Sequence, residues 1–192
     1  MIKAVIFDLD NTLMDFMKMK ISAIDAAIEG MIEAGFIYSS SDIKNRIFDI
    51  YENKGYENQE VFDKLIKEKL GHIDYKILAA GIVSYRKAKE ASLILYPGVK
   101  KTLINLIKQN IKLAVVTDAP SREAWIRLCT VNLHHMFDAV VTFNDTGKHK
   151  PSKEPFLEVL DQLDVEAKNC LMVGDWPDKD VVGAKSVGML TA

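Results

Sequence analysis

Two aspartates separated by one residue, Asp8 and Asp10, end the apolar segment AVIFDLD of residues 4–10. Side chains two residues apart in an extended chain emerge on the same side, so both carboxylates can face one ligand. Polar residues that could also take part in chemistry follow three later apolar segments: Thr117, Asp118, Lys150, Asp175 and Asp180. Carboxylates, a hydroxyl and an ammonium group gathered in one place could bind a metal ion and a phosphate group.

Four short apolar segments end in these residues or precede them, and each is nearly continuous and rich in Val and Ile: residues 2–9, 111–118, 139–143 and 170–175. This pattern is typical of strands buried on both faces of a parallel sheet. Helical segments alternate with the strands: residues 97–110, 121–133, 153–163 and 178–188. Pro97 is expected in the first turn of its helix, and Trp125 is expected to be buried against the sheet. The alternation predicts an α/β fold, a doubly wound, Rossmann-like parallel sheet with right-handed crossovers.

One long interval interrupts the alternation of strands and helices. From residue 15 to residue 95 there is no buried strand, but amphipathic helical stretches occur, among them residues 16–35 and 75–91. We therefore predict a core domain of residues 1–14 and 96–192, with an inserted helical subdomain of residues 15–95. The sequence ends at GMLTA, where a fifth strand begins, so this edge strand is expected to be very short or cut.

The carboxyl ends of the predicted strands define where a ligand would bind. In open parallel sheets, ligands bind beyond these ends, near the point where the strand order reverses. Several carboxylates gathered there would repel one another unless a cation lay among them. Oxygen ligands with open coordination positions favour Mg²⁺ over zinc or copper. Phosphate is then the expected substrate group, because Mg²⁺ and Lys150 both offset its charge.

The same residues resemble the four motifs of the haloacid dehalogenase superfamily of hydrolases, and the likeness extends over nearly the whole chain. DLDNT resembles the first motif and VVTD the second, while Lys150 with Pro151 resembles the third and VGDWPDKD the fourth. The helical insertion resembles the type 1 cap of subfamily I. Within the superfamily, the likeness is greatest to small phosphatases of the glyceraldehyde 3-phosphate and phosphoglycolate kind.

The resemblance implies a role for each catalytic residue. Asp8 would be the nucleophile that forms an aspartyl-phosphate, since an ionised carboxylate needs no general base. Asp10 would protonate the leaving oxygen and later deprotonate the attacking water. Thr117, Asp118 and Lys150 would bind the substrate, with Thr117 holding phosphoryl oxygens and Lys150 balancing charge.

The resemblance also implies a magnesium site. Its ligands would be the Asp8 carboxylate, the main-chain carbonyl of Asp10 and the Asp175 carboxylate. Asp180 would support the metal, through water or by orienting Lys150. Trp176 follows Asp175 where many relatives carry a small hydroxyl residue, and it is expected to narrow the mouth of the pocket or to alter the solvation of the metal.

Two alternative functions use similar residues. A 2-haloacid dehalogenase of the same superfamily would attack carbon without a metal, but halide displacement needs no acid such as Asp10. A receiver-like signalling protein also carries an aspartyl-phosphate beside a Thr and a Lys. Its acidic pair lies on the first strand, its phosphorylated Asp comes later, and it has no large insertion.

Composition limits the partners. The chain has 192 residues, is 48% hydrophobic and 27% charged, and carries a formal net charge of -2, so a nucleic-acid partner is not expected. Its two cysteines, Cys129 and Cys170, form neither a disulfide framework nor a zinc motif. No leader or membrane-spanning apolar run is evident. We predict a cytoplasmic phosphatase of a small phosphorylated metabolite, without a membrane partner, as a monomer or homodimer.

Overall fold

The computed structural model describes residues 1–192 and divides the chain into two compact units. The core unit consists of Met1–Phe16 and Leu93–Ala192, and the helical unit consists of Met17–Ser92. Our sequence-based boundaries, after residue 14 and before residue 96, lie two and three residues away from these. No helix of the structure is both long enough and apolar enough to cross a membrane.

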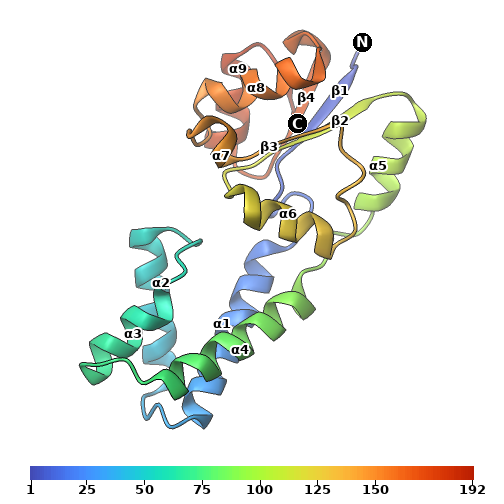
Figure 1. Cartoon of the computed structure of the whole chain (residues 1–192). Coiled ribbons are helices and arrows are strands. Elements are labelled where there is room, and N and C mark those ends of the chain that lie inside the picture. The colour runs from blue at the N-terminus through green and yellow to red at the C-terminus, as the bar shows by residue number, and fades with distance from the viewer. The chain divides into compact units, whose positions relative to one another are not determined.

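A five-stranded sheet forms the centre of the core unit. Its strands are β1 (Ala4–Phe7), β2 (Lys112–Val116), β3 (Ala139–Val141), β4 (Cys170–Val173) and β5 (Leu190–Thr191). The strand order is β3-β2-β1-β4-β5, and every neighbouring pair is parallel (Figure 1). All four residues of β1 are buried, as expected of a central strand covered on both faces. The predicted α/β fold is confirmed.

Helices cover both faces of this sheet. They are α5 (Val99–Lys108), α6 (Ser121–Thr130), α7 (Phe143–Thr146), α8 (Lys153–Leu163) and α9 (Val182–Ser186). The helices α8 and α9 lie on one side of the sheet and α5 on the other (Figure 1). Residues that alternate along the strands pack with α8 in one apolar cluster, which includes Ile6, Val116 and Phe156. The period-two alternation of strands therefore gives each face of the sheet its own layer of helices.

Three local predictions are wrong in detail. Pro97 lies outside α5, because Gly98 is the N-cap residue and the helix begins at Val99. Phe143 begins the short helix α7 rather than ending a strand, since the Thr142 side chain forms a capping box with Asp145. Trp125 is 42% exposed, because the buried face of α6 is formed by Ala124, Arg127 and Leu128 among others.

The helical unit has an apolar centre of its own. It contains α1 (Phe16–Glu33, with Phe16 in the core unit), α2 (Ser40–Lys54), α3 (Val61–Leu70) and α4 (Tyr75–Ser92). Its buried cluster includes Ile28, Ile47 and Leu65. Gly30 and Gly81 let α1 and α4 approach closely, because a Cβ at Gly30 would lie 2.4 Å from the Ser84 Oγ. Local helix–helix packing therefore defines this unit.

A buried lysine ties the helices of this unit together. Lys20 on α1 is 5% exposed, and its ammonium donates to the Tyr56 carbonyl at 2.7 Å and to the Tyr85 hydroxyl at 2.9 Å. The same ammonium lies 4.2 Å from the ring centroid of Tyr51. The positive charge is thus held by oxygen atoms and an aromatic face.

Candidate active site

The topology of the sheet places the candidate residues at the carboxyl ends of its strands. β1 lies between β2 and β4, and the chain moves outward to β3 before returning to the other side of β1 at β4. The strand order therefore reverses between β1 and β4, which is where parallel sheets bind ligands. Asp8 directly follows β1, and Asp175 lies two residues beyond β4.

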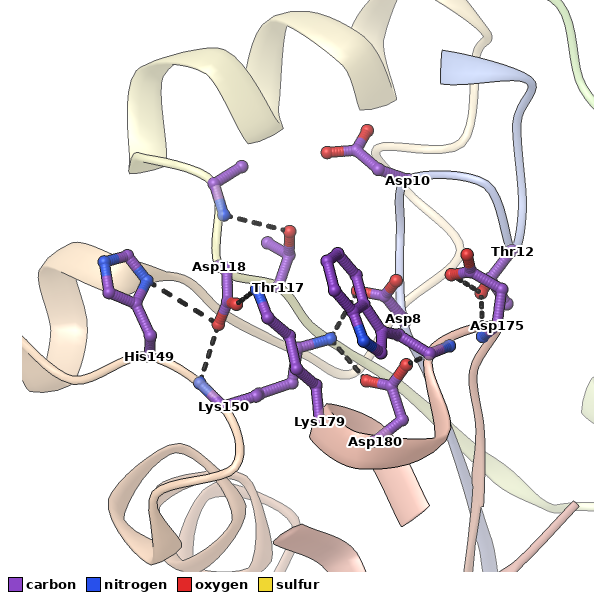
Figure 2. A network of polar contacts seen from close by, with 12 residues as sticks. Asp8, Asp10, Thr12, Thr117, Asp118, His149, Lys150, Asp175, Lys179 and Asp180 are labelled. Atoms are coloured by element: carbon purple, nitrogen blue, oxygen red, sulfur yellow. Dashed lines mark hydrogen bonds and ion pairs between the residues drawn. The ribbon is translucent and has the colours of Figure 1, made fainter. Parts of the chain in front are cut away.

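Lys150 is the centre of a buried polar group. Its ammonium donates to Asp8 Oδ1 at 2.6 Å and to Asp180 Oδ1 at 2.6 Å (Figure 2). Lys150, Asp8 and Asp180 are 5%, 8% and 1% exposed. Asp180 comes from a π-helical turn, η2 (Pro177–Val181), and also accepts the Trp176 N–H at 3.0 Å. Residues 8, 150 and 180 of the sequence therefore form one ion-paired group.

Burial and the charge of the ion-pair partner shift the pKa values of Asp8 and Lys150 in opposite directions. Burial raises the pKa of Asp8 to about 7 although the Lys150 ammonium lowers it. Burial alone would lower the pKa of Lys150, but the Asp8 and Asp180 carboxylates raise it above its usual value. Lys150 is therefore protonated at neutral pH, and an added cation near Asp8 would favour the ionised carboxylate.

Three carboxylates form a candidate metal centre. One oxygen each from Asp8, Asp175 and Asp180 lie within 4.8 Å of one another. Thr12 orients Asp175, since its hydroxyl donates to Asp175 Oδ1 at 3.2 Å and accepts the Asp175 N–H at 3.1 Å. Gly174 is required here because a Cβ would lie 2.4 Å from the Asp180 carboxyl carbon. Such a set of hard oxygen donors fits Mg²⁺.

Asp10 makes a different contact from Asp8. Its Oδ2 accepts a hydrogen bond from the Arg127 guanidinium at 2.7 Å, and Arg127, on α6, is 1% exposed. The guanidinium carbon lies 4.5 Å from the centroid of the Phe16 ring. Figure 2 shows the Asp10 carboxylate turned away from Lys150 and Asp180. Asp10 is thus near the site but is not part of the Lys150 group.

The two residues that follow β2 hold neighbouring loops. The Thr117 hydroxyl, which is buried, accepts the Ala119 N–H at 3.1 Å. Asp118 accepts the Lys150 backbone N–H at 2.8 Å and the Lys179 ammonium at 2.9 Å. The His149 Nδ1 lies 3.7 Å from the same carboxylate. Asp118 therefore fixes the loop that carries Lys150, and a contact of its own with substrate stays a prediction.

Sequence reasoning missed three supporting residues: Thr12, Arg127 and Lys179. Arg127 gave a signal, because it is a basic residue on the buried stripe of its helix, three positions after Ala124 and four before Val131. Thr12 and Lys179 lie within the motif segments DLDNT and VGDWPDKD, but their residue types gave no sign of these contacts, since a hydroxyl in a turn and a lysine in an acidic loop are common on protein surfaces.

Comparisons with known proteins agree with this arrangement. The family described as haloacid dehalogenase-like hydrolase matches residues 5–192. The chain is 37% identical over 191 residues to a glyceraldehyde 3-phosphate phosphatase of Methanocaldococcus jannaschii, covering 100% of this chain and 84% of the relative. It is 35% identical to a protein of the same name from Methanopyrus kandleri, covering 100% and 83%. A haloacid dehalogenase-type phosphatase from Thermococcus onnurineus matches the fold with a TM-score of 0.73 at 26% identity, covering 99% and 85%.

Proposed function

Because the chain belongs to the haloacid dehalogenase-like hydrolases, we propose that it is a Mg²⁺-dependent phosphatase of a small phosphorylated metabolite. The observation that carries the proposal is the group in which Asp8 pairs with Lys150 and shares a carboxylate cluster with Asp175 and Asp180. Relatives named as phosphatases of glyceraldehyde 3-phosphate support a short phosphorylated carbon chain as substrate. The role of the helical unit as a cap and a cytoplasmic location remain predictions from the sequence.

The first step transfers the phosphoryl group to the protein. A carboxylate oxygen of Asp8 attacks phosphorus, the bond between phosphorus and the ester oxygen breaks, and the leaving oxygen takes a proton from Asp10. For this transfer the Asp10 carboxyl group must leave or share its contact with Arg127. Lys150 and the Thr117 hydroxyl stabilise the charge on the phosphoryl oxygens. The products are the free alcohol and an aspartyl-phosphate.

The second step regenerates Asp8. Asp10 now accepts a proton from water as the water oxygen attacks phosphorus, and the bond between phosphorus and the Asp8 oxygen breaks. Inorganic phosphate leaves and Asp8 is again a carboxylate, so atoms and charges balance over the two steps. A bound Mg²⁺ would offset the charge of Asp8 and Asp175 and polarise a phosphoryl oxygen.

A screen of phosphorylated small molecules, with Mg²⁺ present and with excess EDTA, tests the function. We expect release of inorganic phosphate only when Mg²⁺ is present. Phosphate release that persists in EDTA would contradict the Mg²⁺ dependence, and halide release from 2-haloacids without phosphate release would favour the dehalogenase alternative.

Magnesium affinity is expected to depend on pH below about 7. The pKa of Asp8 is raised to about 7 by burial in the metal-free protein, so below that pH a proton competes with Mg²⁺ for this carboxylate. The affinity should fall by up to about ten-fold per pH unit below 7 and level off above it. Calorimetric titration with MgCl₂ between pH 5 and 8 measures this change.

The matched control is Asp8→Asn, which keeps Asp175 and Asp180 but removes the group that titrates near 7. Its weaker Mg²⁺ binding should change little between pH 6 and 8. An equally steep pH dependence in this variant would assign the proton competition to another group.

Replacing Asp10 by Asn is expected to slow turnover of alkyl phosphates by roughly 10²- to 10⁴-fold. The loss in kcat/KM, which reports on the transfer to Asp8 and not on hydrolysis of the phosphoenzyme, should be much smaller for 4-nitrophenyl phosphate, because its leaving oxygen needs no proton. Rates for both substrates, measured with saturating Mg²⁺, give the comparison. Equal losses for both would mean that Asp10 does not act as the acid.

A further inference from the structure

An exposed tryptophan lies beside the candidate metal centre. Trp176 directly follows Asp175 and is 55% exposed, although a large aromatic side chain is normally buried in the core of a protein or in a binding surface. The catalytic steps derived above use Asp8, Asp10, Thr117 and Lys150 and do not require this indole. Its exposure therefore calls for a separate explanation.

The backbone of Trp176 is fixed on both sides. Its N–H donates to Asp180 Oδ2 at 3.0 Å. Its carbonyl accepts the N–H groups of Lys179 at 3.0 Å and of Asp180 at 2.8 Å. Because Asp180 also binds Lys150, the indole is attached to the same buried group that holds Asp8.

The side chain of Trp176 is fixed as well. The Lys179 ammonium lies 4.6 Å from the indole centroid, which is a cation–π contact. The same ammonium is anchored to Asp118 at 2.9 Å, and Asp118 accepts the Lys150 backbone N–H at 2.8 Å. Figure 2 shows Lys179 reaching toward Asp118 from the loop that follows β4. A continuous series of contacts thus joins the indole to the loop after β2.

The orientation of Trp176 is therefore set before any ligand arrives, and the charge of Lys179 is neutralised by Asp118. An exposed, pre-oriented and uncharged aromatic face binds C–H groups, whose positive edges face the π electrons. The indole face offers no set of hydrogen-bond donors for the second phosphate group of a substrate such as pyrophosphate. The chemistry of this face accordingly suits the carbon skeleton of a polyol or sugar phosphate better than inorganic pyrophosphate.

We propose that Trp176 is a fixed aromatic wall that packs against the carbon skeleton of the leaving alcohol, with Lys179 and Asp118 as positioning residues. This inference rests on the proposed phosphatase function and adds to it a residue that determines specificity for the organic part of the substrate. The wall binds the organic part of the substrate and leaves the phosphoryl group to Asp8 and Lys150. Its removal should therefore affect esters but not inorganic phosphate.

Fluorescence tests the contact directly. In the variant Trp125→Phe, Trp176 is the only tryptophan, since the chain contains two. Adding Asp8→Asn prevents turnover, so glyceraldehyde 3-phosphate can be titrated with Mg²⁺ present. We expect a larger change in emission with this ester than with inorganic phosphate at saturation. Equal changes, or no change with the ester, would overturn the proposal.

Kinetics test the consequence for specificity. Trp176→Ala should raise KM for the best ester substrate about ten-fold, while the inhibition constant of inorganic phosphate changes less than two-fold. Trp176→Phe should recover most of the loss, and Trp125→Ala is the control for loss of an exposed indole. Equal changes in the KM of the ester and in the inhibition constant of inorganic phosphate would contradict the proposal that Trp176 contacts the carbon skeleton.

The positioning role of Lys179 has its own readout. Lys179→Met keeps the indole but removes the cation–π contact, so the fluorescence anisotropy of Trp176 should fall and KM should rise, with recovery in Lys179→Arg. An unchanged anisotropy would contradict this role.

The failure of the wall can be distinguished from the failure of the phosphatase function. If the wild-type protein hydrolyses no ester, the phosphatase function fails, and the fluorescence comparison still shows whether Trp176 contacts the ester. If activity depends on Asp8 and Mg²⁺ but Trp176→Ala is unaffected, only the wall fails.

Discussion

Replacing Asp8 by Asn is expected to lower phosphatase activity by at least about 10⁴-fold, because an amide oxygen cannot form the covalent phosphoenzyme. The fold should persist, since the amide has nearly the same volume and Lys150 keeps its contact with Asp180. Phosphate release at saturating Mg²⁺ measures the loss, and far-UV circular dichroism checks the fold. Acid-quenched samples should contain a phosphorylated protein in the wild type and none in the variant.

The control for this substitution is Asp178→Asn, which changes an exposed aspartate in the η2 turn. It should retain nearly full activity. If Asp8→Asn kept more than about one per cent of the rate, a different nucleophile or direct attack by water would have to be assumed. A wild-type phosphoenzyme that lasted for many minutes would favour the receiver-like alternative.

Replacing Lys150 by Met should impair both catalysis and stability. The ammonium is 5% exposed and lies between two carboxylates. Without it Asp8 and Asp180 face each other unpaired, which costs about 3–5 kcal/mol in the free energy of unfolding. The rate should fall by roughly 10²- to 10³-fold or more, because a preorganised charge near the phosphoryl group is lost. Urea unfolding and initial rates measure the two effects.

Magnesium separates the charge of Lys150 from its packing. A divalent cation among the carboxylates would replace part of the missing positive charge, so Mg²⁺ should stabilise Lys150→Met more than it stabilises the wild type. Lys148→Met, an exposed lysine of the same loop, should change neither stability nor rate. If Mg²⁺ stabilised wild type and Lys150→Met equally, the ammonium and the cation would not share one group of carboxylates.

The elements of the core unit could be predicted from the sequence because their signals are local. The helix predicted over 153–163 is α8 without any change of boundary, since its apolar positions recur at helical spacing. The predicted strand over 139–143 ends at Val141 in the structure, because Thr142 is the N-cap of α7 and Phe143 is its first residue. The helix predicted over 178–188 is divided into the π-helical turn at Pro177–Val181 and α9, and the sequence pattern gave no sign of the π-helical geometry of the first part.

Part of the candidate site could also be predicted. Asp8 and Lys150 follow strands whose parallel arrangement gathers their carboxyl ends, so their proximity follows from the topology. The pair of Asp10 with Arg127 joins residues 117 positions apart and depends on the rotation of α6 about its axis. The sequence analysis expected Trp125 on the buried side of that helix, where the structure has Arg127, so the partner of Asp10 was not identified.

The position of β1 in the sheet has a consequence for synthesis on the ribosome. Ala4–Phe7 is translated before its partners Lys112–Val116 and Cys170–Val173, which emerge more than 100 residues later. The helical unit, Met17–Ser92, is complete long before either partner strand and is held together by contacts within itself. The helical unit of the nascent chain should therefore fold first. The apolar strand β1 should remain unpaired until β2 emerges, and should be a binding site for chaperones during that time.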